Sequence, residues 1–151
     1  MGESVAKRDK GTHDKANLVG ARILVVEDND INAEIATELL EEEGCIRERA
    51  CNGVECIDML EKADNSYYAM ILMDIQMPVM DGFGFLDYMK KKDMLKNLPV
   101  IVISGDSSDA SVLHAYKLGA VDFFSKPFSP EIILNRVHNI LSLYKHDYKD
   151  E

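Results

Sequence analysis

The sequence predicts a doubly wound α/β fold, in which five parallel strands alternate with five helices as a (βα)5 chain. Two observations carry this prediction. From residue 21 onward, short apolar runs alternate strictly with longer amphipathic ones, as in strands joined by right-handed helical crossovers. Three of the apolar runs are nearly continuous, which is typical of parallel strands that helices cover on both faces.

Five apolar runs are the predicted strands. The first, RILVVED, is continuous and ends in two acidic residues, whereas the second, CIRERA, alternates and carries charge. We therefore expect the second strand at an edge of the sheet, where one row of side chains meets water. In chain order the predicted strands are 22–28, 45–50, 68–74, 99–104 and 120–125.

The amphipathic runs between the strands have helix signals at their ends. Asn29 or Asp30 can cap the first helix, and Gly44 can end it. Gly119 can end the fourth helix, and Ser129 can cap the fifth. Apolar residues at helical spacing predict the buried faces. Those faces are Ile31, Ile35 and Leu39; Val54, Ile57 and Leu60 beside Cys56; Phe85, Leu86 and Met89; Val112, Leu113 and Tyr116 or Leu118; and Ile133, Val137, Ile140, Leu141 and Tyr144.

The chain has the length of one domain, 151 residues. Residues 1–20 are polar and aperiodic, so we interpret them as a disordered arm or linker. The folded domain is expected over 21–145, followed by a tail at 146–151. No run reaches the roughly 18 apolar residues of a membrane helix, and no signal peptide begins the chain. We therefore expect a cytoplasmic segment without membrane contact.

The charge balance narrows the classes of ligand. The chain carries 17 basic and 27 acidic residues, a formal net charge of −10. This balance argues against direct contact with nucleic acid, which needs a basic face. It suits a divalent cation or a basic surface on a partner, although solubility alone also explains it. The three cysteines and four histidines lack the spacing of metal ligands, so neither a zinc site nor a disulfide framework is expected.

Polar residues stand where the predicted strands end. Glu27 and Asp28 end the first strand, Asp74 the third and Ser104 the fourth, while Lys126 follows the fifth. In doubly wound sheets the ligand site lies at this carboxyl edge. Three crowded carboxylates need a compensating cation, and an all-oxygen site suits Mg²⁺. With a divalent metal and one lysine the charge is balanced, and an aspartate in such a site can be a nucleophile that forms an aspartyl phosphate.

Four motifs in this order resemble one known family. They are the acidic pair at 27–28, MDIQMPVMDG around Asp74, Ser104-Gly105, and KPF at 126–128. In order and spacing they are similar to the receiver domain of two-component response regulators, over about residues 21–145. VEDNDIN together with MDIQMPVMDG is more similar to the receivers of hybrid sensor histidine kinases. The resemblance implies a flavodoxin-like sheet with strand order 2-1-3-4-5.

The resemblance also implies a phosphorelay reaction. Asp74 would accept a phosphoryl group from a histidine of a kinase or of a histidine phosphotransfer protein. Mg²⁺ or Mn²⁺ would be held by Glu27, Asp28, Asp74 and the backbone carbonyl of Gln76. Such a domain is not a conventional enzyme, but it is expected to catalyse its own phosphorylation and dephosphorylation. Gly82, after this loop, is expected to adopt a positive φ.

A conformational switch is implied in the same way. Ser104 would bond a phosphoryl oxygen and turn inward, Lys126 would pair with the phosphoryl group, and Phe123 would follow the hydroxyl. The bond between Lys126 and Pro127 is expected to be cis. The output face is expected at 107–118, 121–124 and the last helix, including His114, Tyr116 and Lys117. A phosphorylation-dependent homodimer is a further expected partner. The kinase-side partner is expected around Asn29–Ala33.

Other interpretations stay open at this point. Asp74 alone could be a cap, the acidic pair could be the N-terminal charge of a helix, and Phe123 could be a core residue. An aspartyl-phosphate hydrolase of the haloacid dehalogenase type would want a second Asp at the position of Gln76. A phosphorylation-independent interaction module is a third class, against which the intact acidic, hydroxyl and lysine positions argue.

Overall fold

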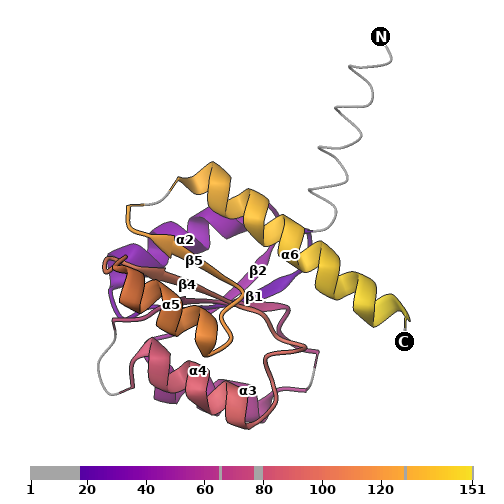
Figure 1. Cartoon of the computed structure of the whole chain (residues 1–151). Coiled ribbons are helices and arrows are strands. Elements are labelled where there is room, and N and C mark those ends of the chain that lie inside the picture. Colours follow the sequence, from indigo (N-terminus) through magenta and orange to yellow (C-terminus); the bar gives the residue numbers. More distant parts are fainter. Residues whose placement is uncertain (1–17, 65, 77–79, 128, 151) are drawn as a thin grey trace.

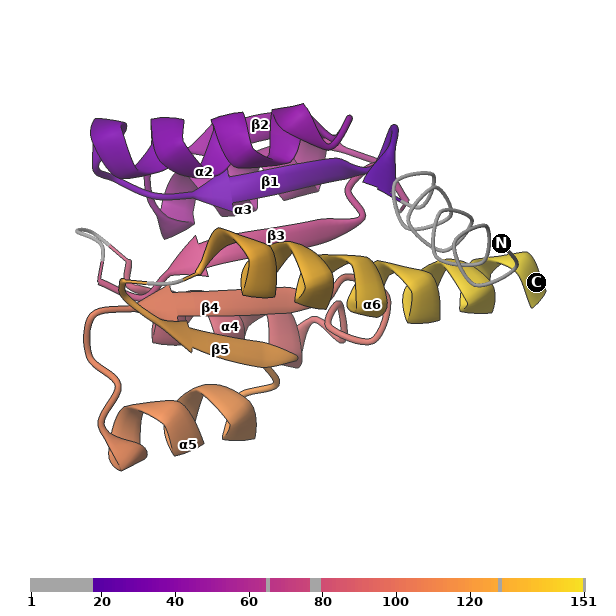
Figure 2. The same ribbon diagram turned by 90° about the horizontal axis from the view of Figure 1, so that it is seen from above.

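The computed structural model describes residues 18–64, 66–76, 80–127 and 129–150, and within them one parallel sheet. Its strands stand in the order β2-β1-β3-β4-β5, as the resemblance implied, and their arrows point the same way where Figure 2 shows them. The predicted (βα)5 fold and strand order are confirmed. The strands are β1 (Arg22–Val26), β2 (Ile46–Ala50), β3 (Met70–Asp74), β4 (Val100–Ser104) and β5 (Asp122–Ser125).

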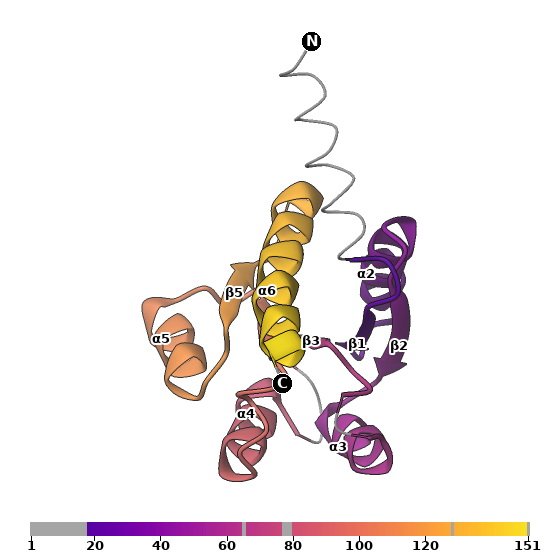
Figure 3. The same ribbon diagram turned by 90° about the vertical axis from the view of Figure 1, so that its right-hand side faces the viewer.

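Helices cover both faces of this sheet, which gives three layers (Figures 1 and 3). Alternate strand residues divide the core between the faces: Ile23 and Val25 pack on the side of α2 and α6, whereas Leu24 and Val26 pack on the side of α3, α4 and α5. The helices are α2 (Asp30–Glu42), α3 (Gly53–Lys62), α4 (Gly82–Lys91), α5 (Asp109–Lys117) and α6 (Pro130–Asp150). Edge strand β2 is charged and partly exposed, as predicted.

The helix ends follow the sequence signals. The Asn29 side chain caps α2 by accepting the N–H of Asn32, which decides between the two predicted caps. Gly44 and Gly119 have φ values of +87° and +108° where α2 and α5 end, so both predicted stops are confirmed. α6 runs on to Asp150 and thus includes most of the predicted tail. Residues 1–17 lie outside the described residues, and the domain boundaries stay predictions.

The predicted buried face of α2 is wrong. Ile31 and Ile35 are 69% and 53% exposed, while Ala33 and Leu40 are buried. Residues 33, 36 and 40 also have helical spacing, and the small alanines allow α2 to lie close to the sheet. Because the stripe with the larger side chains faces outward, α2 leaves an apolar rim beside the carboxyl edge of β1.

Two other predicted faces are also partly wrong. α3 turns Val54 outward and buries Gly53, Cys56 and Leu60. α5 buries Ala115, while Leu113 and Tyr116 are exposed. Leu118, the predicted alternative to Tyr116, packs against the core. In each case a small residue contacts the sheet and a larger one is displaced to the surface. The predicted core residues of α4, Phe85, Leu86 and Met89, are buried as expected. The predicted core residues of α6 are buried too, with Tyr144 packed against them: Ile133, Val137, Ile140 and Leu141.

Gly82 does not have the predicted positive φ. The reason for a glycine there is close packing, because a Cβ atom at this position would lie 2.8 Å from the Cα of Ile75. The Gly82 N–H also donates to the Ile75 carbonyl at 2.9 Å. This contact returns the chain to the end of β3 and starts α4 beside Asp74. No helix in the described part of the chain is long and apolar enough to cross a membrane.

Candidate functional site at the carboxyl edge of the sheet

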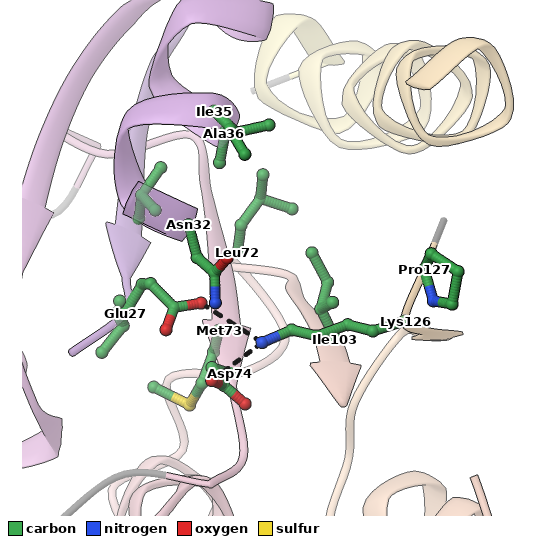
Figure 4. A pocket seen from close by; sticks show the side chains of 12 residues that line it. Glu27, Asn32, Ile35, Ala36, Leu72, Met73, Asp74, Ile103, Lys126 and Pro127 are labelled. Carbon is green, nitrogen blue, oxygen red and sulfur yellow. Dashed lines mark hydrogen bonds and ion pairs between the residues drawn. The ribbon is translucent and has the colours of Figure 1, made fainter. Parts of the chain in front are cut away.

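The strand ends bring the predicted acidic residues together. Carboxylate oxygens of Glu27, Asp28 and Asp74 lie within 4.8 Å of one another, although the residues come from two different strand ends. Glu27 and Asp74 are only 7% and 6% exposed, whereas Asp28 is exposed. The Lys126 Nζ reaches this cluster from the end of β5, 3.2 Å from Asp74 Oδ2 and 3.5 Å from Glu27 Oε1 (Figure 4).

Backbone groups hold the other oxygen of each buried carboxylate. Asp74 Oδ1 accepts the N–H of Gln76 at 3.0 Å, and Glu27 Oε2 accepts the N–H of Asn29 at 3.2 Å. Each carboxylate therefore has one oxygen fixed by its own loop and one oxygen facing Lys126. Asn29 was predicted only as a helix cap. Its backbone N–H also belongs to the site, and no residue spacing in the sequence predicts this contact.

The electrostatics follow from this crowding. Burial raises the pKa of Glu27, and the charge of Asp74 raises it further, against the opposing effects of the Asn29 N–H and Lys126. Burial alone would lower the pKa of Lys126, but its bond to Asp74 and the charge of Glu27 leave that pKa raised. The cluster thus holds more negative charge than Lys126 compensates. Its oxygen donors are hard ligands, and they fit Mg²⁺ in both charge and chemistry.

Ser104 ends β4, the neighbour of the strand that carries Asp74, and Phe123 lies one strand further away in β5. Ser104 is buried, and its hydroxyl oxygen accepts the N–H of Asp106 at 3.0 Å. Among the described residues, no hydrogen bond joins Ser104 to Asp74. Phe123 is half-buried and packs against the core on the side of α3, α4 and α5. Their switch roles stay predictions, as does the role of the Gln76 carbonyl; the predicted cis bond before Pro127 is present.

A cavity opens next to the acidic cluster. Its volume is about 420 Å³, and Figure 4 shows Asp74 and Lys126 at one end and Ile35 and Ala36 of α2 at the other. Leu72 of β3 and Ile103 of β4 line it between them. Sequence reasoning missed this cavity, because the predicted face of α2 placed Ile35 in the core, whereas Ile35 is 53% exposed and lines the cavity. An apolar surface therefore borders the polar site directly.

Comparisons with known proteins point to one family. A family model for the response regulator receiver domain matches residues 23–138. Hybrid signal transduction histidine kinase G of Dictyostelium discoideum is 37% identical over 109 residues, which are 70% of this chain and 3% of that protein. The regulator ycf29 of Porphyra purpurea is 28% identical, and the chain spans 56% of its length. The chain thus spans about half or less of these curated relatives.

A solved receiver structure is similar over most of its length. The receiver domain of a signal transduction histidine kinase from Syntrophus aciditrophicus is 32% identical with a TM-score of 0.74, and the match covers 82% of this chain and 91% of that one. It shares the sheet whose strand ends form the acidic cluster. Because the family model covers most of the chain, the protein belongs to the response regulator receiver domains of two-component signalling systems.

Proposed function

We propose that this receiver domain accepts a phosphoryl group on Asp74 from a phosphohistidine, in a Mg²⁺-dependent reaction. One observation carries the proposal: a buried carboxylate stands at the carboxyl edge of the sheet, 3.2 Å from the Lys126 ammonium and within 4.8 Å of two further carboxylates. A capping or structural aspartate has no need of two more carboxylates beside it, since they only add repulsion.

The chemistry is a transfer between two nucleophiles. An Asp74 carboxylate oxygen forms the new P–O bond while the P–N bond to the donor imidazole breaks, and the departing imidazole nitrogen takes up a proton. Lys126 stays beside the carboxylate, and its ammonium group offsets the negative charge of the phosphoryl oxygens. Glu27, Asp28, Asp74 and the Gln76 carbonyl would hold Mg²⁺, which when bound offsets the same charge.

A route for the conformational signal starts from Ser104. On phosphorylation its hydroxyl gives up the Asp106 N–H and turns toward the phosphoryl group, and Phe123 follows. Residues of β5, α5 and α6 meet next to Phe123. Asp122 Oδ1 accepts the backbone N–H of Phe123 at 2.9 Å and the hydroxyl of Tyr116 on α5 at 3.2 Å. Asp122 Oδ2 accepts from Arg136 of α6 at 2.6 Å. A movement of Phe123 would therefore displace Asp122 and the residues of α5 and α6 that bind it, which belong to the proposed output face.

The experiment that tests the function is site mapping. Wild-type protein incubated with acetyl phosphate and Mg²⁺ is expected to form a hydroxylamine-labile acyl phosphate, because a carboxylate and not a hydroxyl is the acceptor. Borohydride trapping and peptide mass spectrometry are expected to place it on residue 74, and EDTA is expected to abolish it. A stable phosphate ester on Ser104, or labelling that EDTA leaves unchanged, would contradict the proposal.

The apolar rim of α2 supports docking of the phosphohistidine partner on this side. Ile35 lines the cavity that opens at Asp74, and Ile31, one turn earlier on α2, is also exposed. A histidine side chain must come within reach of Asp74, so the protein bearing it has to lie over the adjoining surface. We infer that this partner is a histidine kinase or a histidine phosphotransfer protein. We also propose that the phosphorelay is cytoplasmic and that phosphorylation drives a homodimer of this receiver domain.

Charge on this rim should slow transfer from a protein donor. Ile31→Glu is expected to reduce the rate from a phosphorylated histidine phosphotransfer protein at least about tenfold, the size of a moderate interface contact. Acetyl phosphate needs no docking surface, so its rate should stay unchanged. Leu143→Glu on α6 is the matched control, because Leu143 and Ile31 are 68% and 69% exposed. Equal rates for Ile31→Glu and wild type with the protein donor would refute this docking site.

A further inference from the structure

Arg49 on edge strand β2 binds the loop that carries the acidic pair. Its Nε and Nη2 atoms both donate to the backbone carbonyl of Glu27, at 3.1 and 2.9 Å. Its Nη1 atom lies 2.8 Å from Asp30 Oδ1, in the first turn of α2. One guanidinium thus joins β2 to the end of β1 and to the start of the next helix.

We propose that Arg49 is a positioning residue for the acidic site: it holds the loop after β1 in the conformation that brings Glu27 and Asp28 against Asp74. This inference rests on the proposed function, in which these carboxylates hold Mg²⁺. Arg49 itself is not placed among the ligands, since its contacts are to a carbonyl and to Asp30.

The carbonyl contact acts on the acidic side chains through the peptide bond. A peptide unit is planar, so fixing the direction of the Glu27 carbonyl fixes the plane that joins the Cα atoms of Glu27 and Asp28. Both acidic side chains start from those two atoms. The same residue is held on its other side, because the Glu27 N–H donates to the Ala50 carbonyl at 3.0 Å. Two residues of β2 therefore hold the backbone of Glu27. The Arg49 side chain binds its carbonyl, and the Ala50 carbonyl binds its N–H.

The loop needs such an anchor because its contents repel one another. Carboxylate oxygens of Glu27, Asp28 and Asp74 lie within 4.8 Å, and β1 has already ended at Val26. Repulsion would be relieved most easily by movement of the loop after β1, since Asp74 still belongs to β3. Keeping the carboxylates together before a cation arrives lowers the cost of binding that cation.

The contact between Arg49 and Asp30 contributes less to holding the loop after β1. The side chains of Arg49 and Asp30 are 28% and 90% exposed, and an ion pair with so exposed a partner contributes little. The two bonds to the carbonyl need the planar fork of arginine, which presents several N–H groups in a fixed geometry. Lysine keeps the charge but not the fork, so the exchange of Arg49 for lysine separates geometry from charge.

The test is a titration of the whole chain with Mg²⁺ alone. Arg49→Lys is expected to raise the Kd for Mg²⁺ about tenfold, the lower end of the range for residues that orient metal ligands, as measured by calorimetry. Arg47→Lys is the matched control on the same strand, because Arg47 pairs with Glu41 at 3.3 Å and not with the loop. Its Kd should equal that of wild type. Unfolding in urea with EDTA measures the fold of each variant separately.

Two outcomes decide the inference. Weaker Mg²⁺ binding by Arg49→Lys at unchanged unfolding free energy supports it, whereas wild-type affinity in this variant, or the same loss in Arg47→Lys, overturns it. Should Arg49→Lys fail to fold, Arg49→Gln, whose amide can still donate one bond to the carbonyl, takes its place with the same two outcomes. Phosphorylation is not needed for this titration. A wild type that binds Mg²⁺ but does not label Asp74 therefore refutes the proposed function and leaves the Arg49 inference standing.

Discussion

Asp74→Asn is expected to lower labelling by acetyl phosphate at least about a hundredfold, because an amide oxygen cannot replace the nucleophilic carboxylate. The fold should survive the change. The Asn side-chain oxygen can still accept the Gln76 N–H that Asp74 Oδ1 accepts at 3.0 Å, and the repulsion between Glu27 and position 74 disappears. Labelling is measured by mass spectrometry of the intact protein at fixed time points.

Asp81→Asn is the control for this variant. Asp81 caps α4 by accepting the N–H of Gly84 at 2.9 Å, and asparagine caps helices equally well. Both variants therefore change one aspartate in the same segment of chain, but only one removes the proposed acceptor. Asp81→Asn should be labelled at the wild-type rate. Labelling of Asp74→Asn at the wild-type rate would refute Asp74 as the acceptor.

Glu27→Gln is expected to have two opposite effects. Mg²⁺ binding should weaken at least about tenfold, because one proposed anionic ligand or its charge is lost. The metal-free protein should become more stable by roughly 1 kcal/mol near pH 7, because burial and the charge of Asp74 disfavour the ionised form of Glu27 in the native state. Lys126 keeps its ion pair with Asp74 in the variant. The Gln oxygen can still accept the Asn29 N–H that Glu27 accepts at 3.2 Å. Calorimetric titration and urea unfolding in EDTA measure the two effects.

The stability gain of Glu27→Gln should depend on pH with a definite sign. Burial and the charge of Asp74 raise the pKa of Glu27 above its ordinary value of 4.5. The native wild type therefore holds this proton more tightly than the unfolded chain does. The contribution of Glu27 to the free energy of unfolding is therefore greatest below pH 4.5 and falls as the pH rises through the raised native pKa. Relative to wild type, the variant should thus gain nothing in acid and reach its full gain near neutrality.

Glu38→Gln is the control for both effects, because Glu38 is an exposed residue of α2 away from the acidic cluster. It should change neither Mg²⁺ affinity nor the pH dependence of stability. A destabilised Glu27→Gln variant, or one whose gain is equal at pH 4 and pH 7, would show that the Glu27 carboxylate is not held at a cost in the native protein.

Much of the site could be read from the order of residues along the chain. Glu27, Asp28, Asp74 and Ser104 end predicted strands, and Lys126 follows one. Parallel strands place such positions at one edge of the sheet. The structure brings oxygens of the three carboxylates within 4.8 Å of one another and the Lys126 Nζ within 3.2 Å of Asp74. Contacts made by backbone groups could not be predicted in this way, because every residue offers them. The Asn29 N–H on Glu27 and the Arg49 fork on the Glu27 carbonyl belong to this kind.

The helix faces mark where sequence patterns stop being informative. Nearly continuous apolar runs predicted strands that are buried on both faces, and the alternating, charged run at 45–50 predicted the edge strand. On a helix, several stripes satisfy the same spacing, and only packing against the sheet chooses among them. α2 lies close to the sheet through Ala33, whereas Ile31 and Ile35 face outward. The local pattern thus specified which elements form, although β1 ends at Val26 and not at residue 28, and α6 extends to Asp150. Long-range packing specified the rotation of each helix, and with it the apolar surface beside Asp74.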